Sequence, residues 1–93
     1  MGRLTTHPGE VLREEFMIPL RLSARALGAL IGVPANRLTE IARGRRDVTA
    51  DTAIRLGRYF GTNALFWLNL QAAYDLSKAE RTHDYSAIPL HAS

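Results

Sequence analysis

The chain has 93 residues, with 12 basic and 9 acidic side chains and a formal net charge of +3 at neutral pH. This length supports one small hydrophobic core and excludes two independent domains. Without cysteine there are no disulfides or thiolate metal sites, and the three histidines are too widely spaced for a metal motif. No apolar run approaches the roughly 20 residues of a membrane helix, and residues 1–6 lack the apolar stretch of a secretory signal. We therefore expect a cytoplasmic protein with no membrane partner.

The basic residues are concentrated in the middle of the chain. Residues 21–58 hold eight arginines against three acidic residues, a net charge of +5, whereas the rest of the chain carries −2. Eleven of the twelve basic residues are arginines, whose planar guanidinium group fits phosphate oxygens and guanine edges. This distribution favours nucleic acid as a partner, with a solvated basic surface as the alternative.

The sequence up to residue 32 predicts two helices. The first begins near Pro8, which suits an initial helical turn, and Pro19 stops it. Ser23 is a natural N-cap for a second helix over residues 24–31, and Gly32 ends that helix.

Three further helices follow, and no segment alternates apolar and polar residues as a strand would. The third helix begins near Pro34 and ends at Gly44, and Thr49 caps the fourth, over residues 50–60.

Thr62 is predicted to cap the fifth helix, which covers about residues 63–82. The remaining tail, residues 85–93, shows no strong periodicity. The whole chain is thus expected to be one all-α domain of five helices.

The segment of about residues 23–44 has the spacing of a helix-turn-helix. Two helices that cross steeply over a short turn need a small residue on the inner face of the first helix and a glycine in the turn. Gly28 and Gly32 occupy these two positions. The apolar residues expected to pack around them are Leu27, Ile31, Val33, Leu38 and Ile41.

Further strings accompany this motif: His7 to Leu12, Gly44 to Arg46, Val48 to Thr49, Ala53 to Thr62, and Phe66 to Gln71. With them the chain resembles the HigA (VapI-like) antitoxins, which belong to the phage-repressor-like (XRE-type) DNA-binding domains. The resemblance covers nearly everything from residue 7 to about residue 80. It implies a five-helix homodimer that binds a palindromic operator of its own operon and neutralises a HigB-like toxin, which cleaves mRNA. The chain differs from the family at Pro34, where relatives usually carry Ser or Thr.

If Leu38 and Ile41 face the core, the opposite side of the third helix is free to enter a major groove. The residues expected to contact bases are Ala35, Asn36, Thr39, Glu40 and Arg43. The residues expected to contact phosphates are Ser23, Arg25, Arg37, Arg45 and Arg46. Glu40 has two open roles: it accepts a hydrogen bond from cytosine, or it pairs with Arg37 or Arg43.

The fifth helix is apolar over well more than half of its circumference, and one small domain can cover only one side of it. We therefore expect the other side to meet a second copy of the chain. The predicted interface residues are Phe66, Trp67, Leu70, Ala73 and Tyr74, and the polar side holds Gln71, Asp75 and Lys78. In the alternative, the tail folds back and covers this face with Ile88 and Leu90. A two-fold dimer would place two recognition helices about 34 Å apart, which matches a palindromic operator.

The resemblance favours an antitoxin that also represses its own operon. The alternatives are a stand-alone repressor without a toxin partner, and a protein-binding inhibitor that has lost DNA binding. We find no nucleophile and base pair, no phosphate-binding glycine loop and no metal-ligand spacing, so we expect neither an enzyme nor a cofactor.

Overall fold

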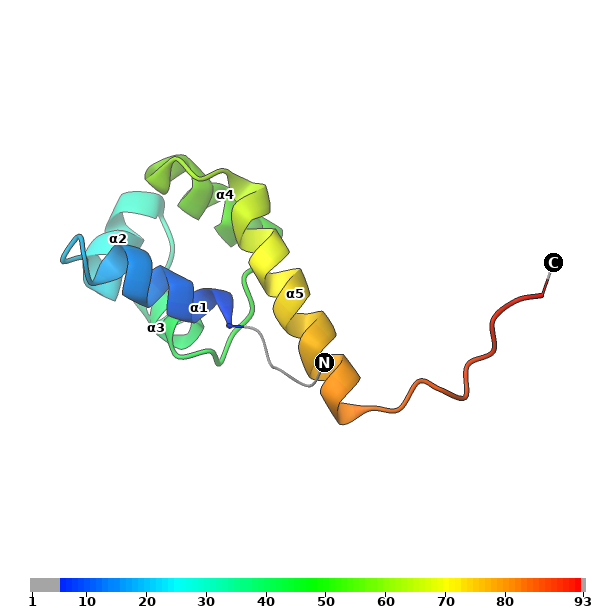
Figure 1. Cartoon of the computed structure of the whole chain (residues 1–93). Coiled ribbons are helices and arrows are strands. Elements are labelled where there is room, and N and C mark those ends of the chain that lie inside the picture. Colours follow the sequence, from blue (N-terminus) through cyan, green and yellow to red (C-terminus); the bar gives the residue numbers. More distant parts are fainter. Residues whose placement is uncertain (1–5, 93) are drawn as a thin grey trace.

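The computed structural model describes residues 6–92. Residues 1–5, where we expect no secretory signal, lie outside the described residues. Within the described residues the chain is all-α, with five α-helices and one π-helical segment. The elements are α1 (Pro8–Val11), η1 (Leu12–Met17), α2 (Ala24–Ile31), α3 (Ala35–Ala42), α4 (Ala50–Phe60) and α5 (Ala64–Thr82). Figure 1 shows α1 to α4 gathered beside the first half of α5, with the tail running away from them. No helix in this part of the chain is long and apolar enough to cross a bilayer.

The first predicted helix is not a regular α-helix. Only one turn, α1, is α-helical, and η1 continues it with wider turns in which the amide of Ile18 donates to the carbonyl of Arg13 at 2.9 Å. Such i to i−5 bonds accommodate an extra residue per turn, and nothing in the local sequence signals them. The start is as expected, because His7 precedes α1 and its Nδ1 accepts a hydrogen bond from the amide of Gly9 at 2.8 Å.

The predicted bounds of α2 and α4 are confirmed, and both helices end as their sequences indicate. The Ser23 hydroxyl accepts from the amide of Ala26 at 3.0 Å, and the Thr49 hydroxyl accepts from the amide of Thr52 at 3.4 Å. The residue after each helix, Gly32 or Gly61, is left-handed with φ near +75°.

The prediction that Thr62 caps α5 is wrong. Asn63 caps this helix, and its Oδ1 accepts from the amide of Phe66 at 3.0 Å. The hydroxyl of Thr62 instead accepts a hydrogen bond from the indole nitrogen of Trp67 at 2.9 Å. In the turn between α4 and α5, Asn63 thus caps the helix and Thr62 binds the buried indole ring.

Trp67 lies at the centre of the hydrophobic core and is 0% exposed. The centroid of its ring lies 5.3 Å from that of Phe16 in η1 and 6.5 Å from that of Phe60 in α4, so it joins η1 and α4 to α5. Its assignment to a dimer interface is therefore corrected, because a fully buried side chain offers no surface to a second copy. The other fully buried apolar residues include Pro8, Leu12, Leu27, Leu38, Ile41, Ala53 and Leu56.

The outer side of α5 remains apolar and exposed. Leu65 and Leu76 are each 64% exposed, and Phe66 is 36% exposed. Of the other predicted interface residues, Ala73 is exposed, Leu70 is half-buried, and half-buried Tyr74 packs edge-on against His7 with ring centroids 4.8 Å apart. The tail does not cover this side, since Ile88 and Leu90 are 69% and 95% exposed.

Candidate nucleic-acid interface

The corner between α2 and α3 is built on Gly28. A Cβ atom at this position would collide with the carbonyl oxygen of Val33, so the two helices cross with no side chain between them. The carbonyl of Gly28 accepts from the amides of Gly32 and Val33 at 2.8 and 3.0 Å, which closes the turn. The apolar residues predicted for the motif are all buried: Leu27, Ile31, Val33, Leu38 and Ile41.

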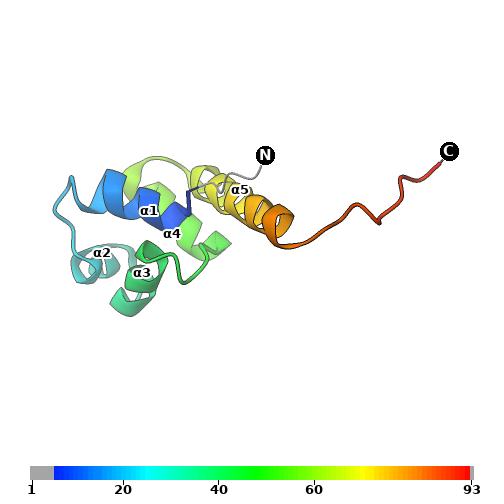
Figure 2. The ribbon, with the colours of Figure 1, turned by 60° about the horizontal axis from the view of Figure 1, so that its bottom comes forward.

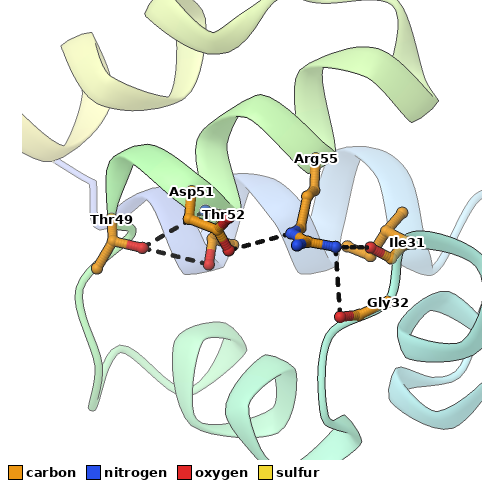
Figure 3. A network of polar contacts seen from close by, with 6 residues as sticks. All are labelled: Ile31, Gly32, Thr49, Asp51, Thr52 and Arg55. Atoms are coloured by element: carbon orange, nitrogen blue, oxygen red, sulfur yellow. Dashed lines mark hydrogen bonds and ion pairs between the residues drawn. The ribbon is translucent and has the colours of Figure 1, made fainter.

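Arg55 of α4 holds this turn from the side. Its Nη1 donates to the carbonyls of Ile31 at 2.9 Å and Gly32 at 3.5 Å, and its Nε pairs with Asp51 at 3.0 Å (Figure 3). A cation at the carbonyl end of α2 also complements the helix dipole. The i, i+4 spacing from Asp51 to Arg55 was visible in the sequence, but the contact with the turn was not.

Figure 2 shows α2 and α3 together on the side of the molecule away from α5. The outward side of α3 and the residue that follows it carry the positions predicted to contact bases. Asn36 and Arg43 are exposed, while Ala35, Thr39 and Glu40 are partly exposed. The hydroxyl of Thr39 donates to the carbonyl of Ala35 at 3.1 Å, so its hydrogen is already used within the helix. Pro34 precedes α3 and provides no capping side chain, as expected.

Glu40 forms an ion pair inside the protein, but with neither of the two arginines considered from the sequence. Its Oε1 lies 2.8 Å from Nε of Arg46, in the loop after α3, and both side chains are nearly half exposed. Helical spacing indicates only partners on the same helix, whereas Arg46 lies in the loop that turns back toward the end of α3. Arg46, predicted to contact phosphate, is thus engaged by a carboxylate in the absence of DNA.

The other predicted phosphate-contacting residues lie at the start of α2, on α3 and in the loop after α3. Within residues 6–92, the guanidinium groups of Arg25, Arg37, Arg43 and Arg45 have no ion-pair partner. Arg25, Arg43 and Arg45 are exposed and Arg37 is partly exposed, while Ser23 is an exposed N-cap. The arrangement is an exposed, cationic helix and loop backed by a closely packed apolar face.

The end of α3 is also fixed by α1 and η1, which the sequence did not indicate. The side chain of Arg13 donates to the carbonyl of Ala42 at 2.9 Å. Gly9 lies so close to α3 that a Cβ atom there would collide with the carbonyl oxygen of Ile41. The first elements thus brace the carbonyl end of the helix whose other side is exposed.

Gln71 was placed on the solvent side of the fifth helix, and this is corrected. It is only 6% exposed, and its Oε1 accepts from the amide of Val48 at 2.7 Å. Its Nε2 donates to Asp47 at 3.2 Å and to Asp75 at 3.0 Å. This residue connects α5 to the loop that follows α3. No group of three metal-ligating side chains is arranged to hold an ion anywhere in residues 6–92.

Comparison with known proteins agrees with this geometry. Residues 12–67 match the helix-turn-helix family model. The chain therefore belongs to the helix-turn-helix family of DNA-binding regulators, which are not enzymes.

Individual relatives show which helix-turn-helix proteins this chain is similar to in sequence and structure. Virulence-associated protein I of Dichelobacter nodosus is 56% identical over 75 residues, which are 81% of this chain and 69% of that protein. Antitoxin GraA in complex with its operator matches with a TM-score of 0.89 and 43% identity, over 99% of this chain and 97% of that one. Pseudomonas aeruginosa antitoxin HigA with the higBA promoter matches with a TM-score of 0.79 and 41% identity, over 90% and 98% of the two chains. Within the helix-turn-helix family the chain is thus HigA-like.

Proposed function

We propose that this protein is the antitoxin of a HigBA-like module, which represses its own operon by binding a palindromic operator and also neutralises an mRNA-cleaving toxin. The observation that carries the DNA-binding part is the exposed cationic side of α3 and its following loop, set on a buried apolar face. The operator-bound relatives support the same part. Their names support the toxin partner, which no contact in this chain addresses.

In this proposal α3 lies in the major groove. Arg43 contacts guanine and Asn36 contacts adenine, because both are exposed and can form two hydrogen bonds to one base. Thr39 presents its methyl group to thymine, since its hydroxyl hydrogen is used by Ala35. Arg25 and Arg45 contact phosphates on either side.

The protein acts as a homodimer in this proposal, with the exposed side of α5 as the interface. The proposed set keeps Phe66, Leu70 and Ala73 and adds Leu65 and Leu76, which are the most exposed large apolar residues of this helix. Tyr74 contributes through its exposed edge. Two recognition helices would then lie about 34 Å apart, one turn of duplex.

DNA binding is tested by titrating the protein with its own upstream region and with a scrambled duplex. We expect the upstream region to bind at least about a thousandfold more tightly at physiological salt. Arg43→Ala should alter base preference, whereas Arg46→Ala should weaken binding to every duplex and reduce the salt slope by about one ion. Equal affinity for the two duplexes would refute sequence-specific repression and favour a protein-binding inhibitor.

Toxin neutralisation is tested separately by expressing the neighbouring reading frame with and without this protein. We expect growth arrest by the neighbour alone and rescue by co-expression. Arg43→Ala should still rescue if, as we propose, the toxin binds outside the cationic side. A neighbour that is harmless, with operator binding intact, would identify a stand-alone repressor instead.

A further inference from the structure

The side-chain amide of Gln71 is fully used by one loop and one helix. Its carbonyl oxygen accepts from the backbone amide of Val48 at 2.7 Å. Its two N–H hydrogens go to the carboxylates of Asp47, at 3.2 Å, and Asp75, at 3.0 Å. Because Gln71 is only 6% exposed, water cannot easily replace these bonds if one is lost.

The same loop is fixed at its other end by the recognition helix. The amide of Gly44 donates to the carbonyl of Ile41 at 2.9 Å, and the amide of Arg45 donates to the carbonyl of Glu40 at 2.8 Å. Arg45 and Arg46 therefore lie on a short span between two anchors, one on α3 and one on α5.

We propose that Gln71 is a positioning residue for DNA binding. It holds the backbone of the loop so that Arg45 and Arg46 reach phosphates, and it keeps the carboxylate of Asp47 against α5. Gln71 itself does not touch the DNA. The inference rests on the proposed function, because it assigns this residue to the same interface.

The position of Gln71 on α5 gives the contact a second consequence. The outer side of α5 carries the proposed dimer interface, so each loop is fixed relative to the second copy as well as to its own recognition helix. The arginines of both loops would then meet phosphates at the spacing set by the dimer.

The direct test replaces Gln71 by glutamate, which keeps the acceptor for Val48 but repels Asp47 and Asp75. We expect Q71E to weaken operator binding about tenfold and to reduce the salt slope by about one ion. Asn69→Asp makes the same charge change at an exposed position of α5 and should alter affinity less than about threefold. A purely structural role would lower the melting temperature and leave the salt slope of the folded protein unchanged.

Rescue provides a second readout. In the Q71E/D47N double variant, the amide introduced at position 47 donates to the carboxylate at position 71, so the hydrogen bond is restored with its direction reversed. We expect the double variant to recover most of the lost affinity. Asp47→Asn alone should bind at least as tightly as the unmodified protein, since it keeps an acceptor and removes a negative charge.

A pair of loop variants keeps the test decisive if Q71E does not fold. Asp47→Ala and Asp47→Asn remove the same charge, but only the asparagine can still accept from Gln71. We expect Asp47→Ala to bind the operator at least about threefold more weakly than Asp47→Asn.

An unchanged salt slope in folded Q71E, or equal affinity of the two Asp47 variants, would overturn the inference. Failure of the proposed function is distinguishable, because the unmodified protein would then show no preference for its operator. The salt slopes of the same variants on a scrambled duplex would still decide whether Gln71 positions the loop.

Discussion

Glu40 places a negative charge on the outward side of α3, where it forms an ion pair with Arg46. The two side chains are nearly half exposed, so their attraction contributes at most about 1 kcal/mol to folding. Its larger effect concerns binding, because a phosphate has to compete with Glu40 for the guanidinium group of Arg46. In the proposed complex the pair therefore limits affinity for any duplex, and base preference is left to Asn36 and Arg43.

Glu40→Gln tests this competition. With no carboxylate competing for Arg46 and one negative charge removed, we expect tighter binding to operator and scrambled duplexes alike. The free energy of unfolding should change by less than about 1 kcal/mol. Titrations with each duplex measure the affinity and urea unfolding measures the stability, with Glu80→Gln on α5 as the matched charge control. A changed preference at a single base pair would instead show that Glu40 contacts a cytosine.

His7 makes stability depend on pH. Burial lowers its pKa below the ordinary value of 6.5, although Asp47 and Asp75 partly oppose this and Lys78 adds to it. The imidazole accepts from the amide of Gly9 and its Nε2 has no hydrogen-bond partner, so the neutral form fits the site. Between the lowered pKa and pH 6.5 the unfolded chain binds more protons than the folded one.

The free energy of unfolding should therefore keep its full value above about pH 6.5 and fall as the pH drops below that value. His7→Asn keeps an acceptor for the cap but does not titrate in this range, so it should flatten the pH dependence. Urea unfolding from pH 5 to pH 8 measures the difference. His83→Asn, in the exposed segment after α5, should leave the dependence as it is. Identical pH profiles for the unmodified protein and His7→Asn would contradict this account.

Single-residue assignments could be predicted only where chemistry and periodicity agree. The inner residues of the motif followed from spacing, because α3 has one apolar side and one polar side. On α5, helical periodicity shows which residues share a side but not which apolar side faces inward. Trp67 was therefore predicted in an interface, although it fills the core. Gln71 was placed in solvent because its partners lie in a loop 23 and 24 residues away in sequence.

At the level of elements, the sequence predicts helix ends well where a cap and a glycine bracket the helix. The bounds of α2 and α4 follow from Ser23, Gly32, Thr49 and Gly61. The π-helical segment η1 could not be predicted, because its longer hydrogen bonds leave no mark in residue type. The contacts of η1 and α1 with α3 depend on this path, so the bracing of the recognition helix also lay beyond sequence reasoning.

Gly28→Ala tests how closely α2 and α3 pack. In an exposed helix this change would stabilise the protein by about 1 kcal/mol through helix propensity. Here the added Cβ collides with the carbonyl of Val33, so we expect a net loss of about 1 to 3 kcal/mol in the free energy of unfolding. Ala29→Gly, at the exposed neighbouring position, should lose about 1 kcal/mol from propensity alone. Urea unfolding distinguishes the two, and a Gly28→Ala protein more stable than the unmodified one would refute the close crossing.

For the molecule as a whole, the cationic side and the exposed apolar side belong to different elements. Arg25, Arg43 and Arg45 lie on α2, directly after α3 and in the following loop, whereas Leu65 and Leu76 lie on α5. A second copy can therefore pack on α5 without covering the cationic side. The extended tail leaves this apolar side open, since its own apolar residues are exposed as well.

Leu76→Glu tests the dimer. Leu65 and Leu76 are eleven residues apart, about three helical turns, so they share one side of α5, and each is 64% exposed. A carboxylate at position 76 would have to be buried between two copies, so we expect a monomer with unchanged helical content. Light scattering over a range of concentrations measures the assembly.

The variant should bind the full palindrome far more weakly than the unmodified protein, while its affinity for a single half-site stays the same. Leu90→Glu in the tail, at a residue 95% exposed, makes the same change and should remain dimeric. If both Leu76→Glu and Leu65→Glu stay dimeric, the two copies meet through another surface, and the operator spacing must be derived from that one.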